Sequence, residues 1–309
     1  MASKKRMLLL IAFLSSLLVA KHYFRNKPTD ELKLSDWFKP RSRSDVITTT
    51  GWLAPVLWEG LFHRQPLEKF YRRRNVTVGL AVFTVGRFAE NELDLFLQSA
   101  DRFFMPSHRV IFYIMAATYP YLPPMAYNPL RSVQVLLLDE ELWWYDLDLV
   151  RMKSLAKHIL SHIRDEVDFL FSMTADLVFE TEFGVETLAT SVAQLHAWWY
   201  FRNTQNFPYE RRLQSAAYIP FGQGDFFYGG SIVGGTPDNV LSLVEEYLAG
   251  LVQDIQKRVN STYEKYLNKF FFLHKPAKLL SPEYGWNPKF QLPPQMRLVR
   301  VSHHPRAHY

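Results

Sequence analysis

The segment from Phe169 to Asp176 places the strongest constraint on the fold. It reads Phe-Leu-Phe-Ser-Met-Thr-Ala-Asp, so a largely apolar run leads to a lone carboxylate. Short apolar runs of this kind are typical of strands that are buried on both faces of a parallel sheet. Ligands of open α/β sheets bind at the carboxyl edge of such strands. The segment therefore predicts a buried parallel strand that carries Asp176 to a ligand-binding edge.

Two apolar patterns alternate along the chain from residue 76 onward. Runs rich in β-branched and aromatic residues predict strands, and apolar residues three or four positions apart predict helices. The expected strands span residues 76–85, 110–115, 133–138 and 167–173, and the expected helices span 91–104, 147–163 and 238–257. This alternation predicts an α/β fold with a Rossmann-like, mostly parallel sheet.

The composition supports one large folded domain with accessory segments. Of 309 residues, 48% are hydrophobic, which is enough to fill a sizeable core. The chain contains no Cys, so a disulfide framework and a thiolate metal site are both excluded. The net charge of +6 is spread out, and no basic stripe is interleaved with aromatic residues. A nucleic-acid partner is therefore not expected.

A short apolar run follows a basic cluster at the N-terminus. At roughly 14 residues it fits a signal-peptide core or an anchor in a thin membrane. The run closes with Leu18, Val19 and Ala20, a poor match to a cleavage site, so an uncleaved anchor is favoured. The expected organisation is a cytoplasmic tail at 1–6, a transmembrane signal anchor at 7–20, a stem at 21–75 whose later part packs on the domain, and a lumenal domain at 76–309.

Two Asn-x-Thr triplets support a lumenal body. They begin at Asn75 and Asn260, and each is a glycosylation acceptor if it meets the lumen. Such triplets also arise by chance in chains of this length, so they are supportive only. Together with the anchor, they predict a single-pass type II protein of the Golgi membrane.

Several charged residues could serve a nucleotide diphosphate. Arg151 and Lys153 lie on the helix before the Asp176 strand, where cations would pair with phosphate oxygens and the carboxylate would bind a divalent metal ion. The alternative is a solvated turn Asp beside surface cations. The loop at 83–88 contains Gly86, which would let the backbone approach a nucleotide, but a plain strand-to-helix turn fits equally well.

An aromatic cluster and a glycine-rich run are candidates for a sugar site. Residues 195–200 place three aromatic residues beside His196, and aromatic faces suit the apolar faces of sugar rings. Core packing is the alternative. Residues 221–235 are rich in glycine but lack the Lys-Ser/Thr of a P-loop, so they form a tight pocket lining or a turn before a strand. For Glu264 alone, helix-terminal electrostatics is the simpler explanation.

Taken together, these stretches resemble glycosyltransferase family 6, the retaining transferases that include α1,3-galactosyltransferase and the blood-group A and B enzymes. The similarity runs from about residue 36 to residue 306. The stretches that carry it are Trp52–Gly60 (WLAPVLWEG), Val78–Arg87 (VGLAVFTVGR), Val110–Met115, Val167–Ser172, Phe183–Leu188 (FGVETL), Tyr209–Arg212, Ala217–Asp225 and Leu279–Tyr284 (LLSPEY). The resemblance implies a GT-A type fold, with a UDP-sugar as donor and a glycan as acceptor.

The resemblance also implies a role for each matching position. The donor loop falls on Phe83, Thr84, Val85, Gly86, Arg87 and Phe88, and the donor-side arginine matches Arg151. The acceptor-contacting motif becomes His196, Ala197, Trp198 and Trp199, and the donor-selecting triplet becomes Gly229, Gly230 and Ser231. These small residues leave room for an acetamido group, so N-acetylgalactosamine is favoured. The glutamate that acts as nucleophile or stabilises the oxocarbenium ion matches Glu264.

The metal motif of the family is eroded in this chain. Its Asp-Val-Asp becomes Thr174, Ala175 and Asp176, so one of the two carboxylates that hold manganese is missing. Fewer charged oxygens bind a hard cation more weakly. The resemblance thus implies a manganese site at Asp176, with Thr174 as a weaker second candidate. The basic tail that closes over the diphosphate is also shortened, and Arg306 could replace one of its cations.

Two functions are compatible with this pattern. The first is a lumenal, retaining transferase that moves galactose or N-acetylgalactosamine onto a glycan in α1,3 linkage. The second is a catalytically silent relative that binds a glycan or a protein partner. Turnover of a UDP-sugar would separate them.

Overall fold

The computed structural model describes residues 31–84, 89–120, 122, 128–138, 146–202 and 207–304. The chain divides into two compact units, Met1–Asp36 and Trp37–Tyr309, and the second contains every strand that the structure describes. Within the described residues, no helix has the length and apolar character needed to cross a bilayer. The anchor predicted at 7–20 lies outside those residues and stays a prediction.

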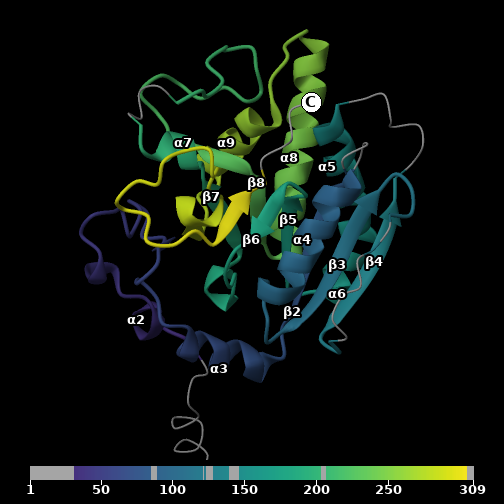
Figure 1. Cartoon of the computed structure of the whole chain (residues 1–309). Coiled ribbons are helices and arrows are strands. Elements are labelled where there is room, and N and C mark those ends of the chain that lie inside the picture. The colour runs from purple at the N-terminus through teal and green to yellow at the C-terminus, as the bar shows by residue number, and fades with distance from the viewer. Residues whose placement is uncertain are drawn as a thin grey trace, which may run out of the picture. The chain divides into compact units, whose positions relative to one another are not determined.

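An eight-stranded sheet runs through the second unit (Figure 1). In spatial order its strands are β1 (Val56–Leu57), β9 (Lys278–Leu280), β7 (Ser191–Leu195), β8 (Tyr228–Gly235), β5 (Phe169–Thr174), β2 (Thr77–Thr84), β3 (Arg109–Ala116) and β4 (Arg131–Leu137). Neighbouring strands are parallel except at β8, which is antiparallel to β5 and to β7. The predicted mostly parallel sheet is confirmed, and the four predicted strands are present as β2, β3, β4 and β5.

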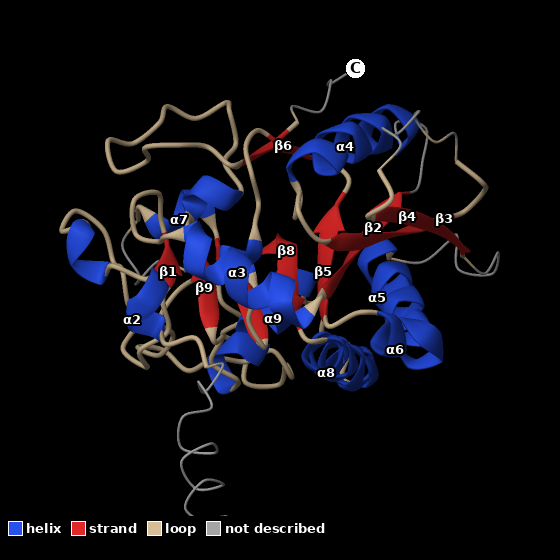
Figure 2. Cartoon of the chain, turned by 90° about the horizontal axis from the view of Figure 1, so that it is seen from below, coloured by secondary structure: helices blue, strands red, loops and turns tan. Residues whose placement is uncertain are grey.

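Helices cover both faces of this sheet (Figure 2). Helix α4 (Ala89–Phe103) lies on one face, and α5 (Leu147–His158) and α8 (Pro237–Gln256) lie on the other. The helix predicted at 147–163 is α-helical to His158 and continues as a π-helical turn, Ile159–Ile163. The shorter elements are α2 (Leu34–Trp37), α3 (Arg64–Arg74), α6 (Arg164–Glu166), α7 (Ala197–Tyr200), α9 (Tyr263–Leu273), the 3-10 turns Pro40–Ser42, Val185–Thr187 and Pro282–Tyr284, and the antiparallel pair β6 (Leu177–Phe179) and β10 (Val301–His303).

Packing between β5 and β8 explains part of the glycine-rich run. Phe171 lies opposite Gly234 in the antiparallel register. A Cβ at Gly234 would come 2.4 Å from the Phe171 ring, so a side chain there would displace a buried aromatic. The same ring packs edge-on against Phe104 and Phe183 in the core. The glycine at 234 is therefore a packing requirement of the sheet.

The strand order reverses at β2, and this reversal places the ligand edge. From β2 the chain moves outward through β3 and β4, then returns on the other side of β2 as β5. Ligands of such sheets bind at the reversal, outside the carboxyl ends of the two adjacent strands. Phe83 near the end of β2 pairs with Thr174 at the end of β5, and Asp176 follows in the next turn.

Residues 37–75 belong to the same compact unit as the sheet. Strand β1 extends the sheet by pairing with β9, and Leu57 and Trp58 are fully buried. Arg64 on α3 forms ion pairs with Glu182 and Glu186. This part of the chain therefore contributes to the core and to the ionic contacts of the unit.

Both predicted glycosylation acceptors are exposed. Asn75 ends α3 in the left-handed conformation, with φ 51°, and Asn260 precedes α9. Exposure is what the modification requires. Glycosylation itself stays a prediction.

Candidate functional site

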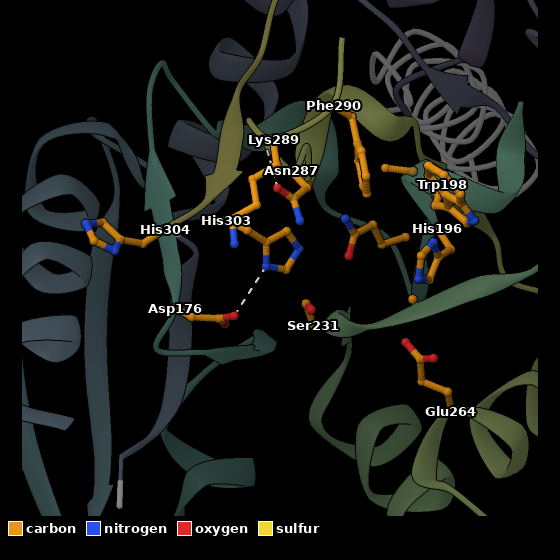
Figure 3. A pocket seen from close by; sticks show the side chains of 14 residues that line it. Asp176, His196, Trp198, Ser231, Glu264, Asn287, Lys289, Phe290, His303 and His304 are labelled. Carbon is orange, nitrogen blue, oxygen red and sulfur yellow. Dashed lines mark hydrogen bonds and ion pairs between the residues drawn. The ribbon is translucent and has the colours of Figure 1, made fainter. Parts of the chain in front are cut away.

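A cavity of about 360 Å³ lies at the carboxyl edge of the sheet (Figure 3). This volume falls within the range of small-molecule sites. Its lining consists of Asp176, Gln194, His196, Ala197, Trp198, Gly229, Ser231, Glu264, Gly285, Asn287, Lys289, Phe290, His303 and His304. Residues predicted for the donor, the acceptor and catalysis thus meet in one cavity, although they lie far apart in the sequence.

Asp176 forms one side of the cavity. Strand β10 pairs with β6 beside it, and the backbone N–H of His304 donates to the Asp176 carbonyl at 2.6 Å. Nδ1 of His303 lies 3.4 Å from Oδ2 of Asp176. Only 17% of the Asp176 side chain is exposed. The carboxylate therefore faces an imidazole within the cavity and not bulk solvent.

Glu264 lies across the cavity from Asp176, with Ser231 between them (Figure 3). Its Oε1 accepts a hydrogen bond from the backbone N–H of Gly230 at 3.1 Å. Burial raises the pKa of the Glu264 carboxyl, while the Gly230 N–H and the nearby His303 act in the opposite direction. When ionised, a carboxylate held in this way can stabilise positive charge that develops on a reacting carbon.

Asn268 fixes α9, and with it Glu264, against β8. Its buried side-chain amide accepts from the Tyr228 N–H and donates to the Tyr228 carbonyl, each at 2.9 Å. Its Nδ2 also donates to the Glu264 carbonyl at 2.8 Å. One side chain thus joins the strand to the helical turn that carries the carboxylate. Nothing in the sequence distinguishes this Asn from a surface Asn, so it was not predicted.

Trp198 and Phe290 form the aromatic wall of the cavity. Their ring centroids are 4.6 Å apart and their planes are inclined by 35°. The guanidinium of Arg202 lies 3.8 Å from the Trp198 ring. Trp198 remains 38% exposed, so part of its indole stays open to a ligand in the cavity.

His196 precedes α7 and lines the same wall. Burial lowers its pKa to about 4, and the nearby His303 adds to the effect. The imidazole is therefore neutral near pH 7, so one ring nitrogen donates and the other accepts. Its Nδ1 is buried and has no hydrogen-bond partner among the described residues.

Two residues predicted for the acceptor site do not line the cavity. Trp199 is partly buried and packs against Phe207 and Phe227 of a buried hydrophobic cluster, as the core-packing alternative expects. Gly230 faces the ring of Tyr263, and a Cβ there would come 2.9 Å from that ring. Its contribution to the site is the N–H that holds Glu264.

The structure describes only some of the residues that were predicted to bind the donor. Arg151 is buried on α5, where its Nη2 donates to Ser172 Oγ at 3.1 Å and its guanidinium lies 5.7 Å from the Tyr263 ring. Its Nε has no hydrogen-bond partner among the described residues. Lys153 is exposed. The predicted donor loop begins with Phe83 and Thr84 at the end of β2, and its other members, Val85, Gly86, Arg87 and Phe88, lie outside the described residues.

The side chains at residues 174 to 176 offer few ligands for a manganese ion. Asp176 supplies one carboxylate, Ala175 supplies no side-chain ligand, and the Thr174 hydroxyl is buried without a hydrogen-bond partner among the described residues. Mn²⁺ prefers octahedral oxygen ligands. Across the described part of the chain, no group of three or more His, Asp or Glu side chains is placed to hold a metal ion. The manganese site implied by the resemblance stays a prediction.

Part of the cavity wall comes from a segment that the sequence patterns did not single out. Asn287, Lys289 and Phe290 lie in irregular backbone, and His303 and His304 lie at the end of β10. Irregular backbone has no hydrophobic period from which a buried or exposed face could be predicted. The adjacent pair of histidines was the one signal that could have indicated this side of the cavity.

Comparison with known proteins shows similarity along most of this chain. The model of glycosyltransferase family 6 matches residues 12–309. Glycosyltransferase 6 domain-containing protein 1 of Macaca fascicularis is 62% identical over 97% of this chain and 98% of its own length. N-acetyllactosaminide alpha-1,3-galactosyltransferase-like 1 of Mus musculus is 46% identical, over 99% of this chain and 100% of its own length. Globoside alpha-1,3-N-acetylgalactosaminyltransferase 1 of Homo sapiens is 34% identical over 91% of this chain and 82% of its own length.

Proposed function

Because the chain belongs to glycosyltransferase family 6, we propose that it is a retaining transferase that moves galactose or N-acetylgalactosamine from a UDP-sugar to a glycan in α1,3 linkage. Relatives named as α1,3-galactosyltransferase-like and α1,3-N-acetylgalactosaminyltransferase proteins support this reaction class. The observation that carries the proposal is the convergence of Asp176, Trp198 and Glu264 on one cavity.

Each part of the cavity has a role in the proposed reaction. The acceptor sugar stacks on Trp198 with a hydroxyl at His196, and Glu264 faces the anomeric carbon. The bond from that carbon to the diphosphate breaks, the bond to the acceptor oxygen forms, and the acceptor proton leaves with the diphosphate. Glu264 stabilises the positive charge that develops between these events.

The donor-selecting triplet favours N-acetylgalactosamine. A Cβ at Gly229 would meet its nearest neighbour, Gln194 Oε1, at 3.6 Å, which is ordinary contact distance. Gly229 and Ser231 both line the cavity with little side-chain volume. The space that they leave suits an acetamido group.

We further propose the cellular setting that the sequence predicts. The protein would be anchored in the Golgi membrane through residues 7–20, with its globular body in the lumen and glycans at Asn75 and Asn260. Cleavage of the glycans by an endoglycosidase, followed by gel mobility, tests this arrangement.

Release of UDP from UDP-galactose and from UDP-N-acetylgalactosamine, with a panel of glycan acceptors, tests the function. Turnover that depends on an acceptor and falls at least 100-fold in Glu264→Gln is expected. The second function, a silent glycan-binding module, is favoured by the Thr174 position, which lacks a carboxylate. Saturable glycan binding that UDP does not change, without UDP release, would establish that module and contradict the transferase.

A further inference from the structure

The side chain of His303 lies beside the Asp176 carboxylate, the group that the resemblance assigns to a metal ion. Nδ1 of His303 is 3.4 Å from Asp176 Oδ2. The backbone sets this contact, because β10 pairs with β6 over three residues and brings His303 opposite Leu177, the residue after Asp176. The His304 N–H bond to the Asp176 carbonyl extends the pairing by one residue. The backbone that carries this imidazole is therefore fixed by strand pairing.

Lys289 adds a full positive charge to the same cavity. Figure 3 shows Lys289 and His303 on the side of Asp176, with Glu264 across from them. The carboxylates of Asp176 and Glu264 would repel a diphosphate unless cationic groups compensate for them. Ammonium and imidazole N–H groups are strong donors to phosphate oxygens.

We infer that Lys289 and His303 hold the diphosphate of a nucleotide sugar in this cavity without a bound divalent metal ion. The inference rests on the proposed function. Nδ1 of His303 faces Asp176, and Nε2 is the ring nitrogen that is left to donate to a phosphate oxygen. The imidazolium form carries a hydrogen on both nitrogens and can donate to both groups at once. Thr174 agrees with this arrangement, because a carboxylate at residue 174 with no metal ion beside it would repel the diphosphate.

Calorimetric titration of the full-length protein with UDP, in EDTA and in millimolar manganese, tests the inference. The dissociation constant is expected to agree within about twofold between the two buffers. In EDTA, Lys289→Gln and His303→Gln should each weaken UDP binding by tenfold or more. Lys257→Gln is the matched control, because Lys257 is exposed outside the cavity and its Nζ donates to the Gln214 carbonyl.

The outcomes separate the inference from the proposed function. UDP binding that requires manganese would overturn the inference and leave the transferase in place. Binding in EDTA that neither substitution weakens would also overturn it. Absence of UDP binding in both buffers would overturn both. Thermal melting of every variant identifies any loss of binding that comes from unfolding.

A variant whose UDP binding should come to depend on manganese provides a second test. Thr174→Asp combined with His303→Ala supplies a second carboxylate and removes the imidazole from Asp176. The double variant should lose UDP affinity in EDTA and regain it with manganese. If the double variant binds UDP as the parent protein does in EDTA, the inference is wrong.

Discussion

The position of Glu264 depends on a glycine, Gly230, on the neighbouring strand β8. The N–H of Gly230 holds the carboxylate, and the space where a Cβ would lie is filled by Tyr263 and by Cγ of Glu264, at 2.9 and 3.3 Å. A methyl group at residue 230 must therefore move the catalytic candidate or the ring beside it. Gly229, the preceding residue, has no such restriction.

Gly230→Ala should lower the free energy of unfolding by about 1–3 kcal/mol, as overpacking of a core does. It should also reduce turnover, because Glu264 is displaced. Urea denaturation measures the first effect and UDP release the second. Gly229→Ala is the stability control and should change unfolding by less than about 0.5 kcal/mol. Equal stability losses in the two variants would contradict the packing explanation.

His196 makes stability depend on pH. Its folded pKa of about 4 lies below the ordinary value of 6.5, so between these pH values the unfolded chain binds a proton that the folded chain does not. Stability is therefore lost as pH falls from about 6.5 to 4, by up to roughly 3 kcal/mol. His196→Gln should remove this part of the acid sensitivity in urea denaturation at pH 7 and pH 4.5. If the difference in unfolding free energy between pH 7 and pH 4.5 is the same in His196→Gln, His196 is not a source of the acid sensitivity.

At the scale of elements, the site depends on how α9 is attached to β8. Asn268 makes three hydrogen bonds across this junction, two to Tyr228 and one to Glu264, and it is buried. A hydrophobic side chain of similar size would leave the Tyr228 N–H and carbonyl unsatisfied. The alignment of the helix that carries Glu264 would then be lost.

Asn268→Leu should cost about 2–4 kcal/mol of unfolding free energy, because each unsatisfied buried group costs about 1–3 kcal/mol. Turnover should fall further than the population of folded protein accounts for. Asn239→Leu on α8 is the control, since the Asn239 amide makes an exposed bond to Thr236 and its loss should cost under about 1 kcal/mol. If Asn268→Leu is as stable as the control, Asn268 does not fix this junction.

The elements that could be predicted from sequence are those whose burial is periodic. Strands β2 to β5 and helices α4, α5 and α8 were predicted because apolar runs and three-to-four spacing record burial directly. The cavity was predicted only in part. His303 is placed by the long-range pairing of β10 with β6, and Lys289 lies in irregular backbone, so neither residue belongs to a local pattern. Trp198 and Trp199 are adjacent and identical in type, so the sequence does not distinguish them. Only the tertiary structure shows that Trp198 lines the cavity and that Trp199 packs against the buried cluster.

At the scale of the whole molecule, the boundary of the folded unit matters for any soluble fragment. The compact unit begins at Trp37, well before the first strand predicted from sequence. Strand β1 and the ion pairs of Arg64 lie between these two points, and Trp58 is fully buried there. Residues 37–75 therefore supply part of the core of this compact unit.

A chain that begins at Trp37 should melt cooperatively at a temperature close to that of the full-length protein and retain UDP binding. A chain that begins at Val76 should be insoluble or should lack a cooperative transition, because β9 loses its pairing with β1 and buried surface around it becomes exposed. Differential scanning calorimetry compares the two. A cooperative transition in the shorter chain would show that residues 37–75 are dispensable.

The stereochemistry of the transfer product tests the central claim most directly. Proton and carbon NMR of the product formed from UDP-N-acetylgalactosamine or UDP-galactose identifies the new anomeric centre and the acceptor carbon that carries it. The predicted product has an α-linked sugar on carbon 3 of the acceptor, and it does not form with Glu264→Gln. A β-linked product, or no product from either donor with every acceptor tested, would contradict the account.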